Sequence, residues 1–142
     1  MKKFGLGLIL LLLLIQFLPI GRDHTNPAIL AEPQWDSPET KQLFNRACAD
    51  CHSHTTNWPW YSNVAPLSWI IFDHVEEGRE HFNVSAWGVQ KHNEGEEAAK
   101  EVEEGEMPIF GYTITHPEAR LSKEEKQLLI KGLEATFGRE ED

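Results

Sequence analysis

Five consecutive residues, Cys48-Ala49-Asp50-Cys51-His52, constrain what this chain can fold into more than any other stretch. The two thiols are three positions apart, so on a helical turn they stand on one side of the backbone. Each thiol could add to one vinyl group of a haem, and the imidazole of His52 could then offer a ring nitrogen to the iron. Cys48 and Cys51 are also the only cysteines in the 142 residues. The pattern therefore predicts one covalently attached haem c, with His52 as its proximal ligand.

Other kinds of site share the Cys-x-x-Cys spacing. A thiol redox pair normally follows a strand in a βαβ unit, and no strand is expected before Cys48. A closed zinc site needs four ligands, but the sequence has no second Cys-x-x-Cys pair and no two histidines at zinc-finger spacing. A structural disulfide, in a haem-free thiol-disulfide protein, remains as an alternative.

The N-terminal residues predict a segment directed to a membrane. Lys2 and Lys3 precede an uncharged run over residues 4–20, in which Gln16 is the only strongly polar side chain. A helix over this run would reach about 25 Å, the short end of what crossing a bilayer requires. We expect residues 1–21 to form an N-terminal transmembrane helix, with a cleaved signal segment as the alternative. The paired lysines place the rest of the chain in the periplasm or outside the cell, anchored to the membrane or, after cleavage, secreted.

The remaining length predicts one domain. Residues 22–36 contain prolines and no apolar period, which is typical of an extended linker. Residues 37–138 would form the haem-binding domain, and residues 139–142 an acidic tail. The formal net charge of −10 argues against nucleic acid as a partner, because phosphate binding needs clustered lysine and arginine. A redox partner protein with a basic surface would be attracted by this negative charge. The oligomeric state stays open.

Helix-start signals and apolar periodicity predict an all-α, small cytochrome c-like domain. Ser37 followed by Pro38 marks the start of a first helix, whose apolar face points the same way as the thiols. Further helices are expected over residues 66–80 and 94–106. A Ser-x-x-Glu capping box at Ser122 begins the last helix, which ends before Gly138 and should contact the first.

Met107 is the leading candidate for the second axial ligand of the iron. Its thioether is a soft ligand, and a methionine opposite histidine raises the reduction potential relative to two histidines. A methionine can also simply fill a core. The alternatives on the distal side are His116, another histidine, or an open site.

The stretch after the motif is unusually rich in rings. We expect these side chains to pack against the porphyrin edge and exclude water, although they could also fill a small core. The four residues predicted to form this haem shell are Trp58, Trp60, Tyr61 and Trp69.

Several charged or titratable side chains have plainer interpretations. His24 is expected to be solvated in the linker, and His54 to lie at the surface or beyond the iron ligands. His74 and His81 would share a helix face as surface histidines. Arg79 could pair with a haem propionate, but an ordinary surface arginine is the simpler prediction.

A family resemblance spans most of the chain. It is carried by Gly21-Arg22-Asp23-His24-Thr25-Asn26-Pro27, Cys48 to His52, Trp58-Pro59-Trp60-Tyr61-Ser62, Ala65-Pro66, Ser68-Trp69, Glu77-Gly78-Arg79, Asn83, Ser85, Gly105-Glu106-Met107-Pro108 and His116-Pro117-Glu118-Ala119-Arg120-Leu121. Together these stretches resemble the exported haem-binding domain family, a c-type cytochrome-like group. The resemblance implies one covalent haem, with Cys48 and Cys51 as tethers, His52 as proximal ligand and Met107 as distal candidate. The chain departs from the family pattern at His54, His81 and Val84, which puts any role of His54 in doubt.

These observations together predict a membrane-anchored monohaem cytochrome that serves one-electron transfer and is not an enzyme. The rival hypothesis is a haem-based sensor or small-ligand-binding module, whose distal ligand would be displaceable. The haem-free thiol-disulfide protein is the third.

Overall fold

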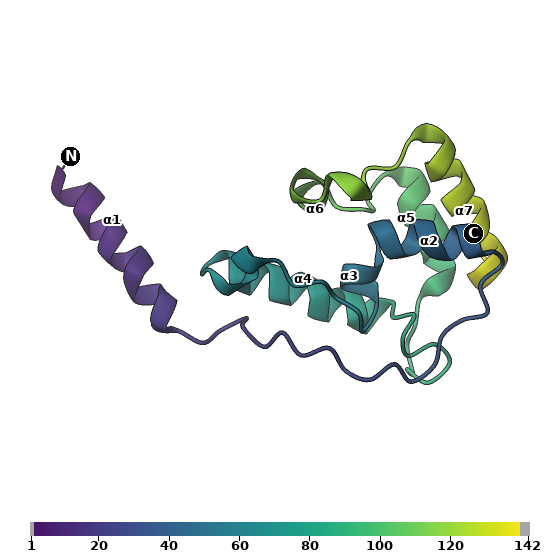
Figure 1. Cartoon of the computed structure of the whole chain (residues 1–142), viewed down its shortest axis with the longest axis horizontal. Helices are drawn as coiled ribbons and strands as arrows, with labels where there is room; N and C mark the ends of the chain where they lie inside the picture. Colours follow the sequence, from purple (N-terminus) through teal and green to yellow (C-terminus); the bar gives the residue numbers. More distant parts are fainter. Residues whose placement is uncertain (1, 140–142) are drawn as a thin grey trace.

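The computed structural model describes residues 2–139, and this part of the chain is built from helices joined by extended segments (Figure 1). Its α-helices are α1 (Lys2–Leu14), α2 (Pro38–Ala47), α3 (Ala49–His52), α4 (Leu67–His81), α5 (Ala98–Glu104), α6 (Phe110–Thr115) and α7 (Lys123–Phe137). Short 3-10 turns cover Ile15–Phe17, Trp60–Asn63, Gly95–Glu97 and Pro117–Ala119. The described residues agree with the all-α prediction.

The prediction of an N-terminal transmembrane helix is wrong. Within residues 2–139, no helix combines the length and the apolar character needed to cross a bilayer. Helix α1 has 13 residues and reaches about 20 Å, against the ~30 Å of a hydrocarbon core. The regular helix stops before Gln16, whose side-chain amide donates to the Ala65 carbonyl at 2.9 Å and accepts from the Ala65 N–H at 3.0 Å.

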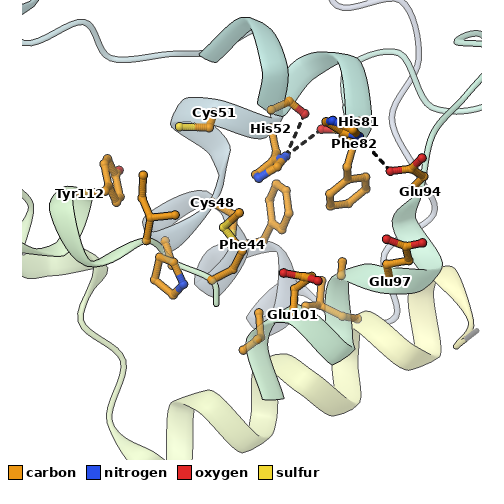
Figure 2. Close-up of a pocket in the computed structure, with 18 of the residues that line it drawn as sticks. Phe44, Cys48, Cys51, His52, His81, Phe82, Glu94, Glu97, Glu101 and Tyr112 are labelled. Carbon is orange, nitrogen blue, oxygen red and sulfur yellow. Dashed lines mark hydrogen bonds and ion pairs between the residues drawn. The ribbon is translucent and has the colours of Figure 1, made fainter. Parts of the chain in front are cut away.

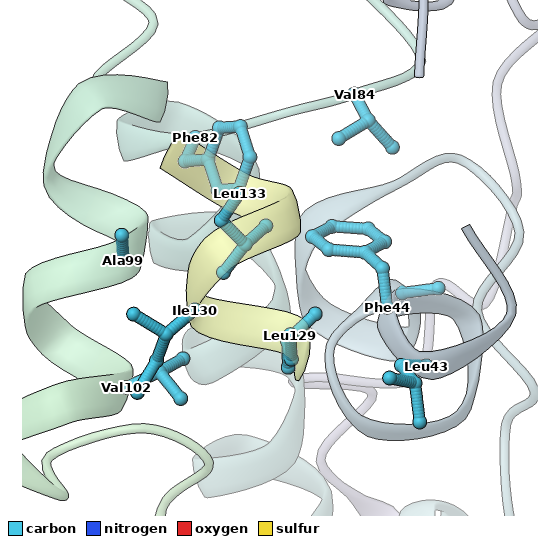
Figure 3. Close-up of a cluster of buried hydrophobic side chains, with 10 residues drawn as sticks. Leu43, Phe44, Phe82, Val84, Ala99, Val102, Leu129, Ile130 and Leu133 are labelled. Atoms are coloured by element: carbon cyan, nitrogen blue, oxygen red, sulfur yellow. The ribbon is translucent and has the colours of Figure 1, made fainter. Parts of the chain in front are cut away.

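The core lies where α2, α5 and α7 meet (Figure 3). Phe44, Leu129 and Leu133 are almost completely buried there, and aliphatic side chains of α5 face them. An ion pair between Arg46 and Glu125, at 2.6 Å, also joins α2 to α7. The predicted contact between the helix that begins after Ser37, α2, and the last helix, α7, is therefore confirmed.

The predicted helix starts are also confirmed. The Ser37 hydroxyl accepts the Thr40 N–H at 3.1 Å, and Pro38 is the first helical residue of α2. At α7, Ser122 Oγ accepts the Glu125 N–H at 3.1 Å while the Glu125 carboxylate accepts the Ser122 N–H at 2.7 Å. These reciprocal bonds satisfy donors that a helix leaves open at its first turn.

The linker over residues 22–36 is extended, as expected, but it lies along the domain (Figure 1). The N–H groups of Leu30 and Ala31 both donate to the Ser85 carbonyl, at 2.9 and 3.2 Å. Near its end, the Trp35 ring packs on Phe44 with ring centroids 5.0 Å apart. The linker is thus an outer layer of the helical domain. Of the acidic tail predicted over residues 139–142, all but residue 139 lies outside the described residues.

Candidate functional site

Cys48, Cys51, His52 and Met107 line one cavity of about 340 Å³ (Figure 2). Three of these residues are neighbours in sequence, but Met107 arrives from the segment between α5 and α6. The cavity volume falls in the ~300–1,000 Å³ range of small-molecule and cofactor sites. Apolar side chains form much of its wall, among them Phe44, Phe82, Val102 and Leu133.

His52 is held by the backbone of α4 and of the residue that follows it. Its Nδ1 atom lies 2.9 Å from the Phe82 carbonyl oxygen and 3.0 Å from the Gly78 carbonyl oxygen, drawn as dashed lines in Figure 2. Carbonyl oxygens only accept, so Nδ1 carries the proton and Nε2 keeps its lone pair. Burial lowers the pKa of His52 against the opposing effect of these two hydrogen bonds, which favours the neutral ring. A neutral imidazole with Nδ1–H fixed by carbonyls is the arrangement that metal-binding histidines commonly show.

The two cysteines lie close to the break between α2 and α3: Cys48 is at the break and Cys51 is in α3. Cys48 has φ −128° and separates α2 from α3, and its N–H donates to the Phe44 carbonyl at 2.8 Å. Both cysteines are free thiols. Burial raises the pKa of Cys48 to about 12 and that of Cys51 to about 11. Thiol redox pairs depend on a lowered pKa, so these raised values do not support the redox-pair interpretation.

Gly78 allows α4 to approach the motif closely. A Cβ atom built on Gly78 would lie 2.8 Å from the Cys51 carbonyl oxygen and 3.1 Å from the Cys51 Cβ. Both atoms belong to α3, and the carbonyl cannot move without moving the helix. The absence of a side chain at position 78 therefore brings the Gly78 carbonyl within reach of His52.

We expect Gly78→Ala to lower the free energy of unfolding by about 1–3 kcal/mol, because a methyl group there forces α3 and α4 apart. Helix propensity alone would favour alanine by about 1 kcal/mol, so a net loss reports the steric contact. Denaturant unfolding measures the change, and any haem bound by the protein should fall in amount as the carbonyl acceptors of His52 are displaced. The control is Gly111→Ala in α6, where a Cβ meets nothing within 4 Å. Equal behaviour of the two variants would contradict the proposed close approach.

Met107 is placed by the end of α5. Gly105 closes that helix with φ +85°, a backbone conformation that favours glycine, and the Met107 N–H then donates to the Glu101 carbonyl at 3.1 Å. The Met107 side chain is partly buried and packs against the core. Its thioether is thus available to the cavity as a soft ligand.

Sequence reasoning missed much of the cavity rim. His74 and His81 are exposed, as expected, but they also line the cavity together with glutamates of α4 and of the residues around α5. His81 Nδ1 lies 3.1 Å from the Glu94 carboxylate. Tyr112 of α6 also lines the cavity, and its hydroxyl donates to Asp50 at 2.7 Å. Burial, and then this bond, raise the pKa of Tyr112. The seven-residue spacing of the histidines was a usable signal, because it places both on one helix face.

The ring side chains predicted to form a haem shell are placed elsewhere. Trp58, Trp60, Tyr61 and Trp69 are absent from the cavity wall. Trp58 stacks on His24 with ring centroids 4.4 Å apart, so the expectation of a solvated His24 is wrong. Trp60 is 79% exposed, and Tyr61 packs edge-on against it. His54 lies away from the cavity, with its Nδ1 2.8 Å from the Ala28 carbonyl oxygen.

The prediction of a surface Arg79 is also wrong. This arginine is 9% exposed and donates to the Ser53 carbonyl at 2.9 Å, to Thr56 Oγ1 at 2.9 Å and to Asn26 Oδ1 at 3.0 Å. Its planar fork of donors suits three acceptors at once. Arg79 therefore fixes the loop that follows His52 and ties it to the linker.

A comparison with known families identifies the chain. The model of the haem-binding domain family matches residues 10–135, which is most of the sequence. The chain belongs to the haem-binding domain family. Haem is accordingly the cofactor of this haem-binding domain, and the residues present fit it: two free thiols, an imidazole with Nε2 available, a thioether and apolar walls share one cavity. No curated protein and no solved structure matches the chain.

Proposed function

We propose that this haem-binding domain protein holds one haem c through thioether bonds to Cys48 and Cys51, with His52 as proximal ligand, and transfers single electrons. The observation that carries the proposal is the state of His52. Its Nδ1–H is taken up by two backbone carbonyls in the cavity that both thiols line. Orientation of the ring, presence of the thiols and a thioether at Met107 all suit haem attachment and ligation.

The haem iron would supply a couple between two oxidation states, while the protein supplies ligands and surroundings. Apolar residues of the cavity wall exclude water, which is one influence on the reduction potential. Met107 opposite His52 would raise that potential. We assign no group to substrate chemistry and propose an electron carrier rather than an enzyme.

We further propose that the haem domain works in the periplasm or outside the cell. Attachment of c-type haem is coupled to export, and an oxidising compartment would otherwise join two neighbouring thiols as a disulfide. Its partner would be a redox protein that approaches the cavity.

The test is to produce the full chain in a cell competent in cytochrome c maturation. A denaturing gel stained for haem peroxidase activity should show haem that remains with the polypeptide. Oxidised and reduced absorption spectra should show a low-spin, six-coordinate iron that binds little carbon monoxide. A colourless product in which Cys48 and Cys51 are joined to each other would refute the proposal and favour the thiol-disulfide protein.

A haem-based sensor is the second candidate. The observation that favours it is the weak anchoring of the segment that follows Met107, since α6 contains no buried residue. A loosely held distal ligand is easily displaced by a small molecule. Strong carbon monoxide binding by the unmodified protein would support the sensor over the electron carrier.

A further inference from the structure

We propose that Tyr112 is a positioning residue: its hydrogen bond to Asp50 holds the Met107 segment at the cavity and so limits access of external ligands to the haem iron. The inference rests on the proposed function, because it assumes Met107 as the distal ligand. It assigns to Tyr112 and Asp50 a role in controlling ligand exchange at that site.

Apart from the packing of Met107 on the core, few contacts hold this part of the chain. No residue of α6 is buried, and its large apolar side chains Phe110 and Ile114 are 79% and 54% exposed. Burial of apolar surface therefore contributes little to the position of α6. The Met107 N–H bond to the Glu101 carbonyl secures the beginning of the segment, and the Arg120 side chain donates to the Thr113 carbonyl at 2.8 Å near its end. Both of those partners are close in sequence.

The bond from Tyr112 reaches across the molecule. Its hydroxyl donates to Asp50 Oδ2 at 2.7 Å, over a separation of 62 residues. Hydrogen bonds to an ionised carboxylate are shorter and stronger than those between neutral groups. Asp50 is itself fixed, because its Oδ1 accepts the Asn57 N–H at 2.8 Å and its carbonyl accepts the Thr56 hydroxyl at 2.7 Å. Asp50 is therefore not free to move together with Tyr112, and the hydrogen bond restrains the position of Tyr112.

Because Asp50 belongs to the haem-attachment motif, the bond from Tyr112 connects two separate parts of the candidate haem site. Asp50 lies inside the Cys-x-x-Cys-His motif, between the two cysteines, while Tyr112 and Met107 line the same cavity from a separate segment that follows α5. Figure 2 shows Tyr112 on the side of the cavity near Cys51, away from the pair formed by His81 and Glu94. The bond therefore links the helix that carries the proximal ligand to the segment that carries the distal candidate.

The strength of the bond determines the size of the effect. Loss of a hydrogen bond to a charged group shifts an equilibrium by on the order of tenfold or more. Without it, the segment that carries Met107 should open more often, and an external ligand should reach the iron more readily. The bond would therefore favour electron transfer over ligand sensing at the same haem.

Tyr112→Phe isolates the hydroxyl. The ring and its stacking on His116, with centroids 4.1 Å apart, are kept. We expect carbon monoxide affinity of the reduced haem protein to rise about tenfold, with a larger five-coordinate fraction in its spectrum. Hydrogen exchange of residues 107–115 should quicken about tenfold in the haem-free chain as well, a readout independent of the haem.

The control is Tyr61→Phe, which removes the same atom from a tyrosine whose hydroxyl has no hydrogen-bond partner among the described residues. It should leave carbon monoxide affinity unchanged. A second measurement places Tyr112→Phe in an Asp50→Ala background, where it should have no further effect if the two groups act as a pair. If Tyr112→Phe does not yield folded haem protein, Asp50→Asn, which weakens the acceptor and keeps its shape, is measured in the same way and should show a smaller rise.

The outcomes separate this inference from the proposed function. A wild-type chain without covalent haem refutes the proposed function, whereas the exchange measurement on haem-free chain still tests the bond. A wild-type chain with Met107-ligated haem, combined with Tyr112→Phe or Asp50→Asn behaviour identical to that of Tyr61→Phe, refutes only the positioning role. Equal effects of Tyr112→Phe in the presence and absence of Asp50 would also refute it.

Discussion

Replacing both thiols, in the variant Cys48→Ala with Cys51→Ala, is expected to abolish haem staining on a denaturing gel. The sequence offers no other cysteine, so no thioether bond could form in this variant. Noncovalent haem held by His52 would dissociate when the protein is denatured. Wild-type protein, made in the same cells, should keep its stain completely.

Single replacements provide the matched comparison. Cys48→Ala and Cys51→Ala each retain one thiol at the cavity and should each keep some covalent haem. A spectrum of the double variant before denaturation separates attachment from ligation, because His52 remains bonded to the carbonyls that orient it. Haem that survives denaturation in the double variant would show that another residue forms the covalent bond.

Met107→Ala is expected to convert a six-coordinate, low-spin haem into one that binds carbon monoxide stoichiometrically. The thioether is the group at the cavity that could occupy the distal position as a soft ligand, and alanine cannot replace it. The reduction potential should fall, because a methionine ligand raises it. Absorption spectroscopy with and without carbon monoxide, together with redox titration, measures both changes.

Ile109→Ala is the control for lost volume. Ile109 lines the same cavity two residues further on and is also partly buried, but its side chain has no atom that can bind iron. This variant should keep the low-spin spectrum. If Met107→Ala also keeps it, the distal ligand is a different residue, and His74 and His81, which line the cavity whereas His116 does not, become the next candidates.

The helices and the motif could be predicted because their signals are local. Ser37 before Pro38 and the capping box at Ser122 act over four residues, and the structure contains both helix starts. The proximal side of the site needed little more, since Cys48, Cys51 and His52 belong to one short stretch. Met107 required the added argument that haem needs a second ligand, and the fold brings this residue to the same cavity.

Predictions failed where a side chain's partner is distant in sequence. Arginine is usually found at the protein surface, which is why Arg79 was predicted there. Its hydrogen-bond acceptors, however, come from the linker and from the loop after the motif. Trp58 was placed near the haem, whereas its neighbour is His24 of the linker. The apolar run at the N-terminus predicted a longer helix, and nothing local indicated that Gln16 would bind the Ala65 backbone.

The anchoring of His52 has a consequence for how this site can change. Both of its hydrogen-bond acceptors are main-chain oxygens, which every amino acid supplies. Exchanging a side chain at position 78 or 82 therefore cannot delete them and can only displace them. A saturation library at these two positions should be sorted by residue size and backbone preference, while the polarity of the new side chain should matter little. The orientation of the His52 ring therefore depends on the backbone conformation around positions 78 and 82, and it can be kept when the side chains at these positions change.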